Sequence, residues 1–214
     1  ILGHNQENNQ KRVDVLNAIV TNSAIGYEVD VLNESLLTEI ANAIFDKFGR
    51  LDGLINAAGG NMPGATVNQD QTIFDISVSD LKKVIDLNLL GSVLPSLTLG
   101  KIMVKQGSGV IINISSMASN QAITRVLGYS MAKAGIEIFT KWMALELATK
   151  FNDKLRVNAL APGFFIGNQN RRLLTNEDGS FTERGNTVIN KTPMKRFGDA
   201  SELNGTVHYL LSDA

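Results

Sequence analysis

The amino-acid sequence predicts an α/β fold built around one doubly wound parallel sheet. Short apolar runs typical of strands alternate along the chain with longer stretches of helical periodicity, and this alternation indicates parallel βαβ units. Polar residues and glycines collect where the predicted strands end, at Asp30, 56–60, Ser116 and 162–163. Because ligands bind beyond the carboxyl ends of the strands in such sheets, we expect the functional site there.

Length and composition favour one domain, residues 1–214, with a small-molecule ligand. A chain of 214 residues is long enough for one sizeable core. The net charge of -1 gives no electrostatic reason to expect nucleic acid or an anionic membrane as a partner. Cysteine is absent and the two histidines, His4 and His208, lie far apart, so we expect neither a disulfide framework nor a metal centre. The apolar runs read as too short to span a bilayer and no signal peptide opens the chain, which favours a cytoplasmic protein.

The first half of the chain reads as alternating strands and helices. The predicted elements are, in order, the end of a strand at 1–3, a helix at 11–20, a strand at 25–31, a helix from Asn33 to the glycine that ends it, Gly49, a strand at 51–58 and a polar loop at 61–77. Ser79 or Asp80 should then begin a long helix that runs to Met103, with a kink at Pro95.

The second half continues the alternation and adds one irregular stretch. The predicted elements are a turn at 107–109, a strand at 110–114, a helix at 129–150 with Ile136, Phe139, Trp142, Met143 and Leu147 in the core, a strand at 155–160 and a helix at 201–211. Residues 164–196 show little periodicity, and a long irregular loop in a compact domain is usually functional or disordered. We therefore expect a mobile substrate lid there.

Three residues around the helix at 129–150 give the clearest chemical signal. Tyr129 and Lys133 are four residues apart, so they lie one turn apart on one helix face. An ammonium beside a phenol favours the phenolate, and such a phenol can exchange a proton near neutral pH. Ser116, after the strand, can hold the oxygen of a reacting alcohol or carbonyl. A chance Y-x-x-x-K on an amphipathic helix is common, and the serine at this spacing favours the catalytic interpretation.

With these residues placed, the sequence resembles the short-chain dehydrogenase/reductase family over essentially its whole length. The matching motifs, in family order, are Asn56-Ala57-Ala58-Gly59, Asn88, Ser116, the Tyr129 and Lys133 pair, and Pro162-Gly163. The resemblance implies a Rossmann-type sheet and an NAD(P)-dependent oxidoreductase that acts on CH–OH groups. It also implies a homotetramer assembled through two long helices, at 80–105 and 129–150 here, which are apolar on more than one side.

The resemblance implies a role for each residue of a catalytic tetrad. Tyr129 would be the general acid/base, Lys133 would assist it and bond the nicotinamide ribose, and Ser116 would orient the substrate oxygen. Asn88 would hold a water of a proton relay at an irregularity in its helix. The structural alternatives are a half-buried tyrosine, a solvated lysine and a helix-packing asparagine, and Ser115 is the neighbour that could take the place of Ser116.

The residues that resemble cofactor contacts of the family are His4, Asp30, Val31, Asn56, Ala57, Ala58, Gly59, Tyr129, Lys133, Pro162 and Gly163. Asp30 could instead cap the next helix, and the segment from Asn56 could be a plain tight turn. His4 lies where the adenosine ribose is recognised, and there an acidic residue favours the free 2′-hydroxyl and a basic one the phosphate. The sequence leaves the choice between NAD and NADP open, and we favour NAD.

Two departures from the family pattern qualify these expectations. The glycine-rich T-G-x-x-x-G-x-G turn that holds the pyrophosphate in the family is absent from this sequence, as is the last strand. The strand before that turn is central in the family, and without it two neighbouring strands would have unpaired edges in the core. We therefore expect the sequence to be part of a longer chain. Gly167 stands near the position where many relatives have a threonine that bonds the nicotinamide carboxamide.

A narrower resemblance concerns the substrate. The segments N-A-A-G-G-N at 56–61, A-P-G-F-F at 161–165 and T-P-M-x-R-F-G at 192–198 resemble the D-mannonate oxidoreductase (fructuronate reductase) branch, which interconverts D-mannonate and D-fructuronate. This implies a hexuronate substrate, with candidate contacts at Ser116, Asn168, Asn170, Arg171 and Arg172. Arginine suits a carboxylate, although a solvated basic pair is equally common. The alternatives are a dehydrogenase for another sugar, polyol or ketone, similar to gluconate 5-dehydrogenase, and a non-catalytic nucleotide-sensing or scaffold protein.

Overall fold

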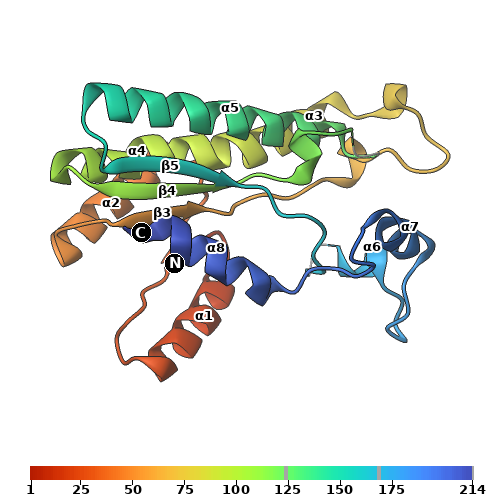
Figure 1. The fold of residues 1–214 in the computed structure, drawn as a ribbon, viewed down its shortest axis with the longest axis horizontal. Helices are drawn as coiled ribbons and strands as arrows, with labels where there is room; N and C mark the ends of the chain where they lie inside the picture. Colours follow the sequence, from red (N-terminus) through yellow and green to blue (C-terminus); the bar gives the residue numbers. More distant parts are fainter. Residues whose placement is uncertain (123–124, 168–169, 214) are drawn as a thin grey trace. The chain divides into compact units, whose positions relative to one another are not determined.

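The structure is a computed structural model that describes residues 1–122, 125–167 and 170–213. It contains two compact units, Ile1–Leu160 and Ala161–Ala214. The first unit holds two parallel sheets, and the strands of the larger one are labelled in Figure 1. One has the strand order β3–β4–β5, formed by Gly53–Asn56, Gly109–Ile114 and Leu155–Leu160, and the other pairs β1 (Leu2–Gly3) with β2 (Tyr27–Glu28). Parallel sheets flanked by helices confirm the predicted fold class.

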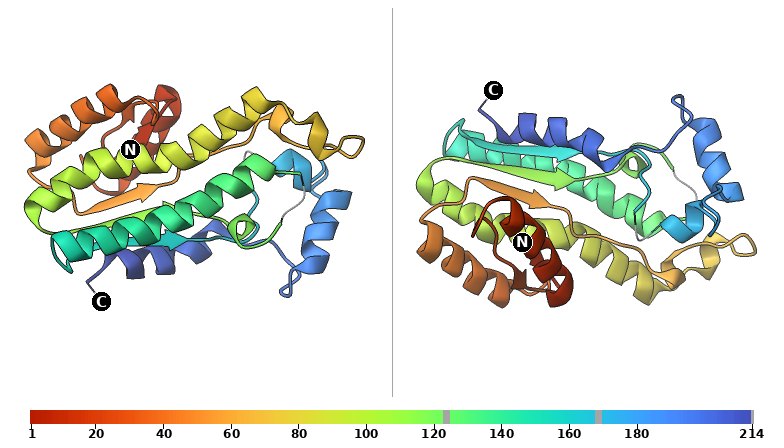
Figure 2. Two further views of the ribbon diagram at one scale, coloured as in Figure 1. Left: turned by 90° about the horizontal axis from the view of Figure 1, so that it is seen from above. Right: turned by 90° about the horizontal axis from the view of Figure 1, so that it is seen from below.

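Three helices of the first unit lie side by side (Figure 2). α4 (Gly91–Gln106) and α5 (Leu127–Lys150) pack on the strands of the larger sheet, and α2 (Glu34–Phe48) packs on α4. α1 (Gln6–Ile19) packs against β1 and β2. The three strands of the larger sheet are in parallel register, with Asn56 opposite Asn113 and Ile114 opposite Leu160. Their carboxyl ends therefore meet at one edge of the sheet, as expected.

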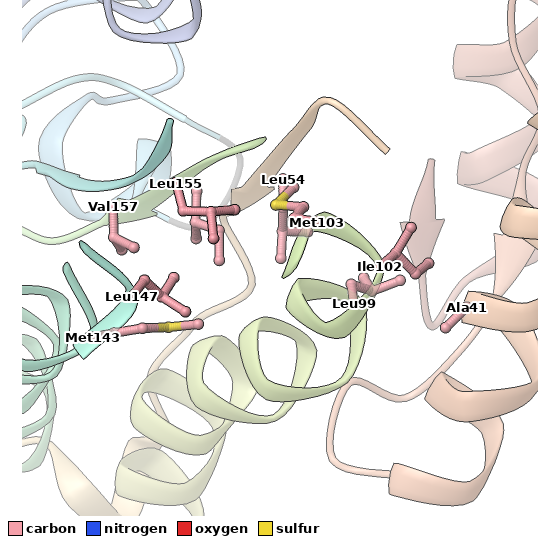
Figure 3. Close-up of a cluster of buried hydrophobic side chains, with 10 residues drawn as sticks. Ala41, Leu54, Leu99, Ile102, Met103, Met143, Leu147, Leu155 and Val157 are labelled. Atoms are coloured by element: carbon pink, nitrogen blue, oxygen red, sulfur yellow. The ribbon is translucent and has the colours of Figure 1, made fainter. Parts of the chain in front are cut away.

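The hydrophobic core fills the space between these helices and the larger sheet (Figure 3). Its buried side chains are Ala41, Leu54, Leu99, Ile102, Met103, Ile111, Met143, Leu147, Leu155 and Val157. Complete burial of one such large side chain contributes about 1.5–3 kcal/mol. The packing is close at the start of β4, where a Cβ on Gly109 would lie 2.6 Å from the sulfur of Met103. The core thus requires glycine at that position.

Capping residues set the ends of the helices. α2 begins after Asn33, whose side chain accepts a hydrogen bond from the Leu36 amide, and it ends at Gly49 in the left-handed region, both as predicted. α1 begins at Gln6, earlier than predicted, because the side chain of Asn5 caps it. α3 (Val78–Ile85) is capped by Ser77, and the prediction of Ser79 or Asp80 was wrong.

Three further expectations differ from the structure. The strand predicted at 25–31 is reduced to the two residues of β2, and the strand predicted at 51–58 is reduced to β3. Trp142 was expected in the core, but it is 64% exposed because it lies on the side of α5 that faces away from the sheet. Ile136, Met143 and Leu147 of the same helix are buried as predicted.

Residues 164–196 are not one long irregular loop. They contain α6 (Arg171–Leu174) and α7 (Glu183–Lys191), and the second unit continues through a 3-10 turn at Ala200–Leu203 to α8 (Asn204–Leu211). The rings of Phe181 and Phe197 pack edge to face with centroids 5.3 Å apart. α7 escaped prediction because most of its residues are polar and Val188 and Ile189 are its only large apolar side chains.

α3, a π-helical turn at Asp86–Leu90 and α4 form one continuous helical stretch, Val78–Gln106. This stretch of 29 residues is long and apolar enough to cross a bilayer, whereas we expected from the sequence that every apolar run would be too short. Half of its most apolar window is buried inside the protein, and Asn88, Ser92 and Ser96 are among its fully buried residues. Both features are typical of a core helix.

A cavity of about 1520 Å³ separates the two sheets of the first unit. Ile1, Leu2 and Gly3 line it on one side, and Gly53, Leu54 and Ile55 line it on the other. β1 and β3 therefore belong to different sheets and do not pair with one another. The strands predicted at 1–3 and 51–58 contain β1 and β3, and we expected the facing edges of these two strands to be unpaired.

Candidate active site

Asn88 lies where the helix geometry changes. It is the middle residue of the π-helical turn, and such turns are frequent at functional sites. Its side chain is fully buried. Nδ2 donates to the carbonyl oxygens of Gly60 at 2.6 Å and Val84 at 2.8 Å, and Oδ1 accepts from the Gly60 amide at 3.2 Å. Asn88 thus ties the helix to the loop that follows β3.

Lys133 is buried against the same loop. It is only 4% exposed, and its Nζ donates to the carbonyl oxygen of Ile114, the last residue of β4, at 2.7 Å. Burial lowers the pKa of Lys133 from 10.5 to about 8. A Cβ on Gly59 would lie 2.7 Å from Asn88 Oδ1 and 3.8 Å from Lys133 Nζ. Both side chains therefore lie beside Gly59, and the alternative of a solvated lysine is wrong.

Tyr129 and Ser116 lie on elements that pack together. Tyr129 is half-buried in the first turn of α5, with its ring centroid 5.5 Å from Lys133 Nζ. Ser116 is half-buried and caps the 3-10 turn Met117–Ser119, which packs against α5. Its Oγ accepts from the Ala118 amide at 3.1 Å.

Ser115, the alternative to Ser116, is engaged elsewhere. It is buried, and its Oγ lies 3.0 Å from Glu137 Oε1 and 3.4 Å from the Lys133 carbonyl oxygen. A hydroxyl has one proton, and a carboxylate is the stronger acceptor, so Ser115 donates to Glu137. This favours Ser116 as the serine that meets a substrate.

The cavity between the sheets extends to the strand ends, where seven predicted cofactor contacts line it: His4, Asp30, Val31, Asn56, Ala57, Ala58 and Gly59. Gly91 also lines this part, and a Cβ there would lie 3.1 Å from Val31 Cγ2. The wall is thus bare backbone beside a small apolar side chain. Backbone without side chains lets a ligand approach closely, so the residues present fit the adenosine end of a dinucleotide.

Asp30 does not cap α2, because Asn33 does. The Asp30 carboxylate accepts instead from the amide of Leu32 at 3.0 Å, which forms a local turn at the cavity wall. The capping interpretation of this aspartate was wrong.

Asn56 has a structural function that the sequence did not reveal. Its Nδ2 donates to Asn113 Oδ1 and to Ser96 Oγ, both at 2.8 Å. Asn113 Nδ2 in turn donates to Thr140 Oγ1 at 2.9 Å. These buried groups link β3 and β4 to α4 and α5, and they support the backbone that continues into Ala57–Gly59.

The substrate candidates other than Ser116 lie in the second unit. Arg171 and Arg172 are exposed on α6, and both line a cavity of about 450 Å³ together with Glu177 and Phe181. Asn170 bonds within its own loop, since Nδ2 donates to the Phe165 carbonyl and Oδ1 accepts from the Gly167 amide, both at 2.8 Å. Pro162 and Gly163 follow β5 at the start of this unit. Asn168 lies outside the described residues.

Sequence reasoning missed two charged residues, Arg125 four positions before Tyr129 and Glu137 four positions after Lys133. Arg125 has a backbone φ of 80°, rare for a non-glycine residue, and its guanidinium donates to the Val67 carbonyl at 2.9 Å and to Asn68 Oδ1 at 2.8 Å. Glu137 accepts from side chains of the segment 115–120. The helical spacing of Glu137 from Lys133 was the one signal in the sequence that could have indicated it.

Comparison with known proteins defines the class. The family model described as Enoyl-(Acyl carrier protein) reductase matches residues 1–214. The chain belongs to the short-chain dehydrogenase/reductase family, and it is an oxidoreductase that uses NAD or NADP.

Particular relatives carry different names. An uncharacterized oxidoreductase, UxuB, of Bacillus subtilis is 40% identical over 222 residues, which cover 100% of this chain and 78% of the relative. A 3-oxoacyl-[acyl-carrier-protein] reductase of Synechocystis is 34% identical and covers 89% of this chain and 69% of the relative. The crystal structure of a Haemophilus influenzae protein, provisionally named D-mannonate oxidoreductase and solved with bound NAD, has a TM-score of 0.88 and 39% identity, and covers 98% of this chain and 77% of that one.

Proposed function

We propose that this protein interconverts D-mannonate and D-fructuronate, with NAD as the preferred cofactor. The observation that carries the chemistry is that the Asn88 and Lys133 side chains both lie beside Gly59, with Tyr129 one helical turn from Lys133. The substrate is supported by the likeness to the provisionally named D-mannonate oxidoreductase, whose structure contains NAD. The motifs at 56–61, 161–165 and 192–198 support the same branch.

Tyr129 moves the proton in this proposal. When bound, the cofactor exchanges a hydride with the substrate carbon, so the protein must supply or remove one proton at the substrate oxygen. The Tyr129 hydroxyl protonates the carbonyl oxygen in reduction and removes the hydroxyl proton in oxidation. The Lys133 ammonium, 5.5 Å from the ring centroid, favours the phenolate during that exchange. Ser116 orients the same substrate oxygen through its hydroxyl.

Asn88 and Lys133 also have binding functions in the proposal. Lys133 bonds the nicotinamide ribose, since an ammonium has three N–H donors and one of them already bonds the Ile114 carbonyl. Asn88 Oδ1 has a second lone pair beyond the one used by the Gly60 amide, and this can hold a relay water. Asp30, Val31 and Ala57–Gly59 enclose the adenosine.

The carboxylate of a hexuronate distinguishes it from a neutral sugar, and Arg171 and Arg172 are the proposed readers of that group. A bidentate arginine–carboxylate pair in a water-poor site contributes about 1.5–3 kcal/mol. We expect Arg171→Ala/Arg172→Ala to lower kcat/KM for D-fructuronate by about tenfold to a hundredfold, and to leave a neutral ketose of similar size unaffected. Lys191→Ala, which removes an exposed cation of the same unit, is the matched control. An equal loss for both substrates would refute the carboxylate contact.

Reduction of an acyl ketone is the second candidate function. The description of the family model and the Synechocystis relative both favour it. Oxidation of the reduced cofactor, followed by absorbance, should be measured with D-fructuronate, neutral ketoses and a short 3-oxoacyl thioester. Preference for the thioester would replace the sugar-acid proposal with this one.

We also propose a cytoplasmic homotetramer. α4 and α5 expose large apolar side chains on the side away from the sheet, namely Leu97, Met131, Ile138, Trp142 and Leu145. A helix that is apolar on two sides buries both, and a second copy of this chain can cover the outer one.

A further inference from the structure

The Glu137 carboxylate gathers three donors from one short segment. Glu137 lies on α5, one helical turn after Lys133. Its Oε1 is 3.0 Å from Ser115 Oγ and 3.4 Å from Asn120 Nδ2, and Ser119 Oγ also donates to it. All three donors belong to residues 115–120, the turn after β4 that carries Ser116.

These contacts bracket Ser116 on both sides. Ser115 precedes it and Ser119 follows it, and each can donate its single hydroxyl proton to the carboxylate, which is a stronger acceptor than a carbonyl. The amide of Ser119 bonds the carbonyl oxygen of Ser116 at 3.0 Å, which closes the turn. Ser116 Oγ accepts from the Ala118 amide within the same turn. The orientation of the Ser116 hydroxyl therefore depends on where the turn is held.

We propose that Glu137 is a positioning residue that holds Ser116 at its working distance from Tyr129. Tyr129 and Glu137 are both on α5. A turn that is bonded to Glu137 is therefore held in a fixed position relative to the helix that carries the acid/base. Misplacement of a catalytic group by about 1 Å can lower the rate a hundredfold. A charge-assisted hydrogen bond that fixes the turn therefore protects the rate by holding Ser116 in place. This inference rests on the proposed catalytic roles of Ser116 and Tyr129.

The donors explain why the residue is a carboxylate. Ionised acceptors make shorter and stronger hydrogen bonds than neutral ones, and a carboxylate has about four lone-pair sites. Glutamine can still accept at Oε1 but brings an NH₂ group that meets further donors. Alanine removes the carboxylate altogether and leaves the buried hydroxyl of Ser115 with the more distant Lys133 carbonyl as its acceptor. The three side chains at this position should therefore rank glutamate, glutamine, alanine in activity.

The test compares Ser116→Ala, Glu137→Ala, their double variant and Glu137→Gln in the full chain, with the best carbonyl substrate found. We expect Glu137→Ala to lower kcat by about tenfold to a hundredfold, with cofactor affinity, followed by nicotinamide fluorescence, within about twofold of the wild type. Glu137→Gln should recover most of that loss. In the Ser116→Ala background, Glu137→Ala should lower kcat by less than about twofold, because the two residues act as a unit.

Controls separate positioning from stability. Glu146→Ala removes a carboxylate of the same helix that pairs with Lys150 at the surface, and it should keep wild-type kcat. Ser119→Ala removes the hydroxyl that donates to Glu137 and should lower kcat by about threefold to tenfold. This variant tests the positioning role of Glu137 if Glu137→Ala does not fold. Wild-type kcat in Glu137→Ala or Ser119→Ala, or losses that multiply in the double variant, would overturn the inference. Wild-type kcat in Ser116→Ala would instead refute the proposed role of Ser116.

Discussion

Replacing Lys133 by methionine should stabilise the protein while it removes activity. The Lys133 ammonium is almost completely buried, and loss of hydration lowers its pKa from 10.5 to about 8. A charged group in such a position is held at a cost to the folded state, since the charge prefers water. Methionine is of similar length and has no charge, so it removes that cost.

The magnitude follows from the pKa. A fall from 10.5 to about 8 is about 2.5 pKa units, and at 1.36 kcal/mol for each unit the desolvation cost is about 3 kcal/mol. Methionine also loses the bond from Nζ to the Ile114 carbonyl, which contributes about 1.5 kcal/mol. The net gain in the free energy of unfolding is about 1–2 kcal/mol, which raises Tm by about 2–8 °C in a chain of this size.

The stability difference should depend on pH in one direction. Below pH 8 the lysine is protonated in both folded and unfolded chains, so the full cost is present. Between pH 8 and 10.5 the folded protein has released the proton and the unfolded chain still binds it, so the wild type gains stability as pH rises. The advantage of Lys133→Met should therefore shrink across that window in thermal unfolding followed by circular dichroism. Lys141→Met, at an exposed lysine of the same helix, should show neither effect. A lower Tm for Lys133→Met at pH 7, or an advantage independent of pH, would refute the reasoning.

Three further predictions concern the acid/base, the packing of the site and the assembly. Tyr129→Phe should lower kcat by at least about a hundredfold and leave cofactor affinity within a few-fold; retention of a tenth of kcat would exclude it as the acid/base. Gly59→Ala should cost about 1–3 kcal/mol and lower kcat, because the new Cβ would lie 2.7 Å from an Asn88 oxygen held by the Gly60 amide, whereas Gly205→Ala meets no atom within 4 Å and should be neutral or better. Sedimentation should show a tetramer that Trp142→Glu dissociates; a wild-type monomer would contradict the assembly.

Features governed by local rules could be predicted from the sequence. Asn33 and Gly49 bound α2 as expected, because an asparagine side chain satisfies amides at a helix start and glycine adopts the left-handed conformation at its end. β5 has the predicted bounds because apolar and polar residues alternate from Leu155 to Ala159, which is the period of a strand. The i, i+4 spacing of Tyr129 and Lys133 likewise placed them on one side of α5, where Lys133 Nζ lies near the ring.

Features that depend on partners far along the chain could not be predicted. The bond from Asn56 to Asn113 joins residues 57 positions apart, and the contact of Arg125 with Val67 spans 58. Nothing local to Asn56 distinguishes a side chain that braces the sheet from one that faces a cofactor. The burial of Lys133 is of the same kind, since a helical lysine is solvated unless neighbouring elements enclose it.

The end of β4 explains why lysine can be buried at this point in the fold. Within a sheet every backbone carbonyl is bonded to a neighbouring strand, and a lysine would find no acceptor there. At the last residue of β4 the Ile114 carbonyl is instead directed to Lys133, while the next amide, that of Ser115, still bonds the carbonyl of Leu160. The strand end thus supplies an acceptor for one of the three N–H donors of the ammonium, and Ser116 follows two residues further on. The end of strand pairing at β4 therefore brings the Lys133 ammonium and the Ser116 hydroxyl to the same end of the strand. A strand that continued its pairing could not do so.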